Sequence, residues 1–301
     1  MIIDTHIHLS HYLYNNEFPF LSLEEGEFSI QRGTREELIQ QLRSSAISAC
    51  IEPGIDLESN QRILSLAEQY SDFLFPAVGV HPTRTYQYKV VENGSSAVRR
   101  LHWNQRHLIE QYAEYPGVFA IGETGLDYHL PRKEQHRLCQ MAWFIFQLRL
   151  AHRKKLPVIL HIRKADKDAL RILKLFRRCL HGGVCHCFVG SADLAREYTS
   201  LGIMLGIGGT LLMDTPLKNN LEQAVIHTPM ESILLETDGP YVKPSCPELK
   251  KKQMKKARNT SLILPAVAMR IAELKQLPVE EVLKVSAENA VYLFNLPCKL
   301  P

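Results

Sequence analysis

The feature that most constrains the fold is a regular alternation of short apolar runs with amphipathic segments. Eight apolar runs occur, at 1–9, 46–55, 73–81, 118–127, 157–164, 182–190, 203–209 and 232–240. Several are continuous, such as Val158-Ile159-Leu160, which is typical of strands buried on both faces. Helix-like segments follow at 34–46, 58–70, 98–114, 133–154, 165–179, 191–201, 216–227 and 259–276. Eight strand–helix pairs predict an α/β fold, a single (β/α)8 TIM barrel.

Two further segments refine this expectation. Residues 278–294, opened by Pro278, predict an extra C-terminal helix, and we expect one barrel domain over residues 1–301. Residues 10–33, after the first strand, are rich in aromatic side chains and exceed the usual loop length. They form either a lid that contacts substrate or a loop that packs on the barrel. No GxGxxG turn follows the first run, which argues against a doubly wound dinucleotide-binding sheet.

Composition excludes several classes of protein. With 36 basic against 32 acidic residues the net charge is only +4, too small to require a nucleic-acid partner by itself. The longest uncharged stretch, 198–213, is shorter than a membrane span of ~20 residues. The first residues lack the pattern of a secretory signal, and the seven cysteines form no CxxC pair, which favours reduced thiols and a cytoplasmic protein. We expect no membrane association and no organic cofactor; the oligomeric state stays open, and a monomer is compatible with the sequence.

Histidines and carboxylates stand near the ends of five of the apolar runs. His6 and His8 alternate with Ile7, so in a strand they point to the same side. The carboxyl ends of barrel strands converge on one pocket, where a charged group is costly unless it is paired or bound to a metal. The residues that can surround one or two cations there are His6, His8, Glu123, His161, His186 and Asp238.

This mixture of imidazole and carboxylate suits Zn, Mn, Fe or Co, with Mg less favoured. The positive charge of two divalent ions exceeds the negative charge of two carboxylates and a bridging hydroxide, so the site would attract an anion such as phosphate. We expect the metal-bridging hydroxide to be the nucleophile and Asp238 to orient the water and take its proton.

The run from Lys250 to Arg258 holds six positive charges in nine residues, between the eighth strand and the last barrel helix. Such a run is either a solvated surface or, beside a hydrolytic site, a contact for nucleic-acid phosphates.

Nine short motifs, in order along nearly the whole chain, resemble those of the TatD-type deoxyribonuclease family, a branch of the TIM-barrel metal-dependent hydrolases. They are Asp4–His8, Val80–Pro82, Gly122–Asp127, Leu160–Arg163, His186–Phe188, Gly206–Gly209, Leu235–Pro240, Arg258–Asn259 and Asn289–Phe294. Each is weakly specific alone, but together they are highly specific.

The resemblance implies a two-metal site and hydrolysis of phosphodiester bonds in DNA, with exonuclease action among the options. Glu123 matches the glutamate that bridges the metals. His6 and His8, with Asp238, match the ligands of one metal, and His161 and His186 match those of the other. His81 matches a histidine thought to contact the scissile phosphate, and charge and position suggest Arg163 and Arg258 as further phosphate contacts.

Two other functions stay open at this stage. One is a lactonase, amidase or phosphoesterase acting on a small molecule at the same two-metal site, because barrel folds host many chemistries. The other is a catalytically silent, metal-containing nucleic-acid-binding protein. The long segments at 10–33 and 82–117 lie where substrate would enter, so they leave the size of the substrate open.

Overall fold

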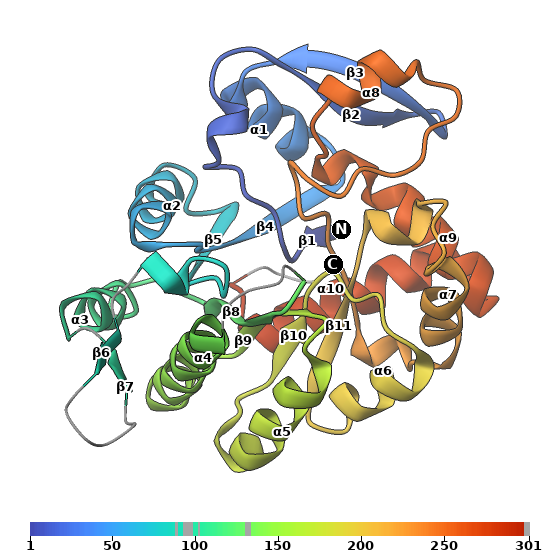
Figure 1. Ribbon diagram of the computed structural model, residues 1–301. Helices are drawn as coiled ribbons and strands as arrows, with labels where there is room; N and C mark the ends of the chain where they lie inside the picture. The colour runs from blue at the N-terminus through green and yellow to red at the C-terminus, as the bar shows by residue number, and fades with distance from the viewer. Residues whose placement is uncertain (88–89, 93–98, 102, 130–133, 298–301) are drawn as a thin grey trace.

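The computed structural model describes residues 1–87, 90–92, 99–101, 103–129 and 134–297. Within them, eight parallel strands form one sheet whose spatial order is also their order along the chain (Figure 1). Each of these eight strands falls inside one of the predicted apolar runs, so the α/β prediction is confirmed. The strands are β1 (Ile2–Asp4), β4 (Ile47–Pro53), β5 (Leu74–Val78), β8 (Ala120–Asp127), β9 (Val158–Arg163), β10 (Gly183–Cys185), β11 (Ile203–Ile207) and β12 (Ile233–Leu235).

The two outer strands of this sheet are joined by backbone hydrogen bonds just beyond β1 and β12. The N–H of Thr5 donates to the carbonyl of Leu235 (3.0 Å), and the N–H of Asp238 donates to the carbonyl of His6 (2.8 Å). Ile7 and Gly239 form a parallel bridge. These contacts bring the first and last strands of the sheet together, as the predicted TIM barrel requires.

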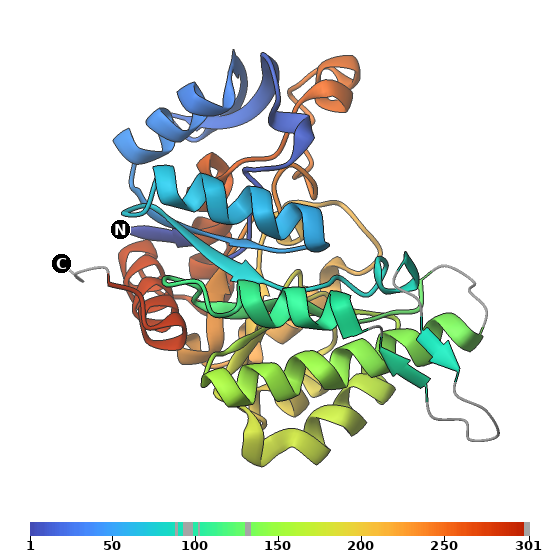
Figure 2. The same cartoon turned by 90° about the vertical axis from the view of Figure 1, so that its left-hand side faces the viewer.

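The helices surround the sheet, and all except the short helix at Lys251–Lys256 match predicted segments (Figures 1 and 2). They are α1 (Arg35–Ser44), α2 (Leu57–Gln69), α3 (Trp103–Tyr112), α4 (Glu134–Lys154), α5 (Asp166–Phe176), α6 (Ala192–Thr199), α7 (Lys218–His227), α8 (Lys251–Lys256), α9 (Leu264–Lys275) and α10 (Val279–Phe294). Short 3-10 turns occupy Tyr12–Tyr14, Thr85–Gln87, Arg177–Cys179, Gly209–Leu212, Met230–Ser232 and Ser261–Ile263. The predicted helix starts at 98 and 133 lie outside the described residues. No helix in the described part of the chain combines the length and apolar character that crossing a membrane demands.

The predicted extra helix, α10, packs against one end of the barrel. Inward-facing residues of seven strands, among them Ile3, Phe75 and Leu234, form one buried cluster with Ala290 and Phe294 of α10. This packing fills the amino end of the barrel with apolar side chains. A polar site can therefore form only toward the carboxyl ends of the strands.

The segment 10–33 is an antiparallel hairpin rather than an irregular loop. Its strands are β2 (Phe18–Glu24) and β3 (Glu27–Gly33). Phe20 and Leu21 are fully buried in the main core, so the hairpin packs on the barrel. A second hairpin, β6 (Val90–Glu92) with β7 (Arg99–Leu101), occupies part of the other long segment. Strand β7 stands where the start of a helix was predicted.

Candidate metal centre

Seven side chains from six strand ends meet at the carboxyl end of the barrel. They are His6, His8, His81, Glu123, His161, His186 and Asp238. All six residues predicted as metal ligands are in this cluster, together with the predicted phosphate contact His81. Pairs of their polar atoms lie 2.9–3.9 Å apart.

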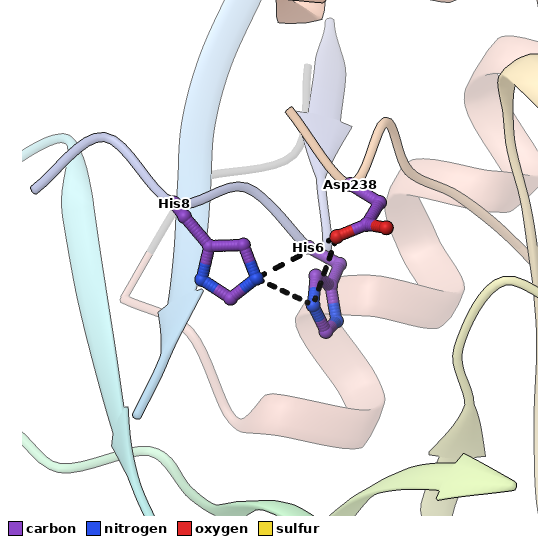
Figure 3. Close-up of side chains that lie close together, drawn as sticks. All are labelled: His6, His8 and Asp238. Atoms are coloured by element: carbon purple, nitrogen blue, oxygen red, sulfur yellow. Dashed lines mark hydrogen bonds and ion pairs between the residues drawn. The ribbon is translucent and has the colours of Figure 1, made fainter. Parts of the chain in front are cut away.

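His6, His8 and Asp238 form one side of the cluster and point toward one another (Figure 3). The two Nε2 atoms are 3.3 Å apart, and an Asp238 carboxylate oxygen lies 3.8 Å from His6 Nε2 and 3.5 Å from His8 Nε2. Strand β1 ends at Asp4, so both histidines lie past the regular strand, on either side of the bridging residue Ile7. The predicted convergence of the histidines is confirmed, although they do not lie within a continuous strand. Asp238 has φ 53°, a left-handed conformation that is uncommon outside glycine.

Glu123 lies at the centre of the cluster, and its side chain is 3% exposed. One carboxylate oxygen is 2.9 Å from His186 Nε2, 3.6 Å from His6 Nε2 and 3.7 Å from His161 Nδ1. The other oxygen is 3.7 Å from His8 Nε2. Glu123 thus stands between the two halves of the cluster, as a bridging ligand would.

A break in strand pairing turns Glu123 inward. Ala120 belongs to the cluster at the amino end of the barrel, so strict alternation would point Gly122 inward and Glu123 outward. The register between β8 and β9 instead shifts between Ile121 and Thr124. Beyond the shift, the Thr124 hydroxyl accepts a hydrogen bond from Gln147 of helix α4, so Thr124 faces the helices. An irregularity of this kind re-aims the neighbouring side chain.

His161 and His186 form the other side of the cluster. Their Nδ1 and Nε2 atoms, respectively, are 3.0 Å apart, and His161 Nε2 lies 3.1 Å from Asp127 Oδ2. The other oxygen of Asp127 accepts the N–H of His129. Asp127 therefore orients a histidine so that its second nitrogen faces Glu123. Carboxylate–histidine pairs of this type commonly position metal ligands.

Burial and mutual charge set the protonation of the cluster. Burial, followed by the charge of His161, lowers the pKa of His81 to about 3, and burial also places the pKa of His6 well below its usual range. Burial would raise the pKa of Glu123, but the surrounding histidines hold it well below its usual value. Burial acts against a charged His8, yet Asp238 and Glu123 together outweigh it and raise the pKa of His8 to about 9. The centre therefore presents an ionised glutamate beside the neutral imidazoles of His6 and His81, and a bound cation would displace the proton that its neighbours stabilise on His8.

Two buried carboxylates near the cluster were not singled out from the sequence. Glu236 Oε1 accepts the N–H of Cys187 and lies 4.0 Å from His186 Nδ1. Asp4 accepts hydroxyl hydrogen bonds from Thr237 (2.6 Å) and Ser261 (2.7 Å) and so ties β1 to the end of β12. The signal for Glu236 was its position two residues before Asp238, which places both on the same side of an extended chain.

The two predicted arginines lie apart from this cluster. Arg163 ends β9 with an exposed side chain, and Arg258 pairs with β2 through its backbone. Within the described residues, neither guanidinium forms a hydrogen bond or ion pair with the seven-residue cluster.

The donor atoms form three groups that could each hold an ion, and two of these groups share His6. In each group the ligand atoms lie within 4.8 Å of one another: His6–His8–Asp238, His6–His186–Glu236 and His81–Glu123–His161. A barrel with inward histidines and carboxylates at the carboxyl ends of its strands is the arrangement of a metal-dependent hydrolase.

Comparison with known proteins defines the family. The model of the family described as "TatD related DNase" matches residues 3–295, so the chain belongs to this family of metal-dependent hydrolases. The resemblance inferred from the motifs is confirmed.

Known relatives align with almost the full length of this chain. A protein of Bacillus subtilis named "Uncharacterized metal-dependent hydrolase YabD" is 30% identical and aligns with 98% of this chain and all of its own. The "3'-5' ssDNA/RNA exonuclease TatD" of Edwardsiella piscicida is 32% identical, covering 92% of this chain and 98% of the relative. The crystal structure of the TatD homologue YjjV from Escherichia coli superposes with a TM-score of 0.74 at 26% identity, covering 98% of each chain.

Proposed function

We propose that this protein hydrolyses phosphodiester bonds in single-stranded DNA with two divalent metal ions. The observation that carries the proposal is the placement of Glu123 between His6 and His8 on one side and His161 and His186 on the other. Relatives named single-stranded DNA and RNA exonucleases, at about 30% identity, support this substrate and an exonuclease action. Family membership supports the hydrolytic chemistry.

We assign His6, His8 and Asp238 to one metal, and His161 and His186 to the other, with Glu123 bridging the two. The chemistry of the donor set fits Zn, Mn, Fe or Co, and Mg less well. When bound, a pair of divalent ions would activate a water for attack on phosphorus and neutralise charge on the phosphoryl oxygens.

Several side chains in and around the centre have roles beyond binding the metal ions. Asp238 is 16% exposed, more than Glu123, so it can reach an entering water, orient it and accept its proton. Asp127 fixes the ring of His161. His81, whose imidazole is neutral because burial lowers its pKa to about 3, can donate one hydrogen bond to a phosphate oxygen. Arg163 and Arg258 lie farther out and would contact phosphates away from the scissile one.

The setting proposed for this reaction is a single barrel domain in the cytoplasm. Six cysteines within the described residues are free of disulfides, which supports a reducing compartment. A monomer is sufficient for the site, because every proposed ligand comes from one chain.

The test is cleavage of single-stranded DNA labelled at its 3′ or its 5′ end. Metal-stripped protein is assayed alone and after addition of Mg, Mn or Zn, with Asp238→Asn as the inactive variant and Asp168→Asn, outside the cluster, as its matched control. Metal-dependent product ladders that vanish only in Asp238→Asn support the proposal, and the label that shortens gives the polarity. If about two ions bind per chain but no DNA is cleaved, the proposal is wrong, and lactones and small phosphoesters become the substrates to screen.

A further inference from the structure

A hollow separates the insertion, residues 10–33, from helix α8. It has a volume of about 660 Å³. One wall is the segment from Tyr12 to Pro19, which leads into β2, and the other is α8 with Arg258. Both views show α8 beside the β2–β3 hairpin, although more than 200 residues separate them in sequence (Figures 1 and 2).

The positive side chains of α8 gather on this hollow. Lys252, Lys255 and Lys256 have the i, i+3, i+4 spacing that places residues on one face of a helix, and all three line the hollow. Their side chains are exposed, and none of them forms an ion pair within the described residues. The acidic residue of the lining, Glu17, is already paired with Arg32 at 2.6 Å. The hollow therefore holds unneutralised positive charge that repels itself and attracts a polyanion.

The wall formed by α8 is fixed in place by hydrogen bonds. The Lys243 ammonium donates to the carbonyl oxygens of Met254 and Ala257 at the end of the helix. The N–H of Arg258 donates to the carbonyl of Pro19 (2.8 Å), which ties α8 to the hairpin. The Arg258 Nε atom is buried without a hydrogen-bond partner, although it is a strong donor on the lining of the hollow.

A row of rings connects the hollow with the metal centre. The rings of His8 and Tyr241 are 6.4 Å apart between centroids, and those of Tyr241 and His11 are 5.5 Å apart. The Tyr241 hydroxyl and His11 Nε2 are within hydrogen-bond distance, at 2.9 Å. The ring centroids of His11 and Tyr12 are 4.2 Å apart, and Tyr12 is 68% exposed and lines the hollow. Exposed aromatic faces beside a basic groove are the usual platform for single-stranded nucleic acid, since every base can stack on them.

We propose that the hollow between α8 and the insertion binds the part of a single-stranded nucleic acid that extends beyond the metal centre. Bases pass over Tyr241 and Tyr12, and the backbone phosphates lie on Lys252, Lys255 and Lys256. This inference rests on the proposed nuclease function for its substrate class, and it adds a second binding region built from the insertion. It makes the enzyme sensitive to the length of the strand.

The first experiment measures binding separately from cleavage. A fluorescein-labelled 15-nucleotide single strand is titrated in excess EDTA, which stops turnover, between 50 and 200 mM salt. The variant Lys252→Gln/Lys255→Gln/Lys256→Gln should bind more weakly, and the slope of log affinity against log salt should flatten by about 2, given about 0.7 per phosphate contact on a single strand. The matched control, Lys155→Gln/Arg177→Gln/Arg178→Gln, makes the same charge change at exposed residues toward the amino end of the barrel and should bind as wild type does.

The aromatic contact is tested at Tyr12, which is exposed enough to change without disturbing the core. Tyr12→Ala should weaken binding roughly 5- to 150-fold, the loss of one stacked base, while Tyr12→Phe keeps the ring and the affinity. In the metal-loaded enzyme, both the lysine variant and Tyr12→Ala should slow cleavage of the 15-mer and leave cleavage of a trinucleotide unchanged.

Three results would overturn the inference. The first is that the wild-type protein does not bind the 15-mer. The second is that the lysine variant and the control variant lose affinity equally. The third is that an acidic peptide of equal charge binds as tightly as the 15-mer and depends on the same lysines. Lysine-dependent binding without cleavage by the metal-loaded enzyme would refute the proposed nuclease function and leave the binding inference standing.

Discussion

Replacing Asp127 with asparagine should weaken one metal site and spare the other. Asp127 Oδ2 lies 3.1 Å from His161 Nε2, and its second oxygen is engaged by the N–H of His129. This contact keeps a proton on His161 Nε2, so a metal ion that displaces the proton of Nδ1 finds that atom directed toward Glu123, 3.7 Å away. An asparagine amide in place of Oδ2 presents a donor to Nε2, so the proton moves to Nδ1, the atom that must bind the metal.

The size of the effect follows from the contact that is lost. A hydrogen bond to a charged group is worth about 1.5–3 kcal/mol, which corresponds to a loss of roughly 10- to 150-fold in affinity. Removal of a carboxylate that orients a histidine ligand typically costs 10- to 100-fold in metal affinity. The His6–His8–Asp238 group does not contact Asp127, so its affinity should change by less than about twofold.

The assay is a competition titration of metal-free protein with Zn or Mn against a chromogenic chelator, fitted to two sites. Wild type and Asp168→Asn should give the same two affinities, and Asp127→Asn should lower one of them. Equal weakening of both sites, or of neither, would refute the assignment of His161 to a separate metal held in place by Asp127.

Three further predictions concern stability. Phe294→Ala should lower the free energy of unfolding by about 3–5 kcal/mol in urea titrations, because this fully buried ring closes the amino end of the barrel; an effect below 1 kcal/mol would contradict that role. Thr34→Ala removes the capping box that Thr34 forms with Glu37 at the start of α1 and should cost about 1 kcal/mol, with Thr34→Ser as the neutral comparison. Arg43 lowers the pKa of Asp72, so this exposed ion pair stabilises the fold by at most about 1 kcal/mol at any pH above the ordinary pKa of an aspartate. The stabilisation is lost as the pH falls through the lowered pKa of Asp72, so Asp72→Asn should be as stable as wild type at acidic pH and less stable at pH 7. A stability difference that stays the same across that pH range would contradict this account.

The order of strands and helices could be predicted from the sequence because it depends on local periodicity. Continuous apolar runs such as 158–160 predicted buried parallel strands, and the tail at 278–294 predicted the helix that closes the barrel. The residues that converge, including His6, His161 and Asp238, were found by the same reasoning. Strand ends meet at one edge of a parallel barrel, whatever the details of pairing.

The orientation of Glu123 and the partners of the histidines were decided by tertiary structure. Local alternation would have pointed Glu123 outward, and only the pairing of β8 with β9 introduces the shift that turns it inward. The contact of Asp127 with His161 likewise joins two strands that are distant in sequence.

The insertion likewise has some features that could be predicted from the sequence and others that only the tertiary structure determines. Its aromatic composition and the six charges at 250–258 could be read directly, but each was compatible with a plain surface. Only folding brings Tyr12 and the lysines of α8 to one hollow. The sequence by itself determined which elements form and which side chains stand at their ends, because those depend on neighbours a few residues away. Register, ligand orientation and the walls of the groove depend on hydrogen bonds between segments up to about 240 residues apart, so only the tertiary structure could decide them.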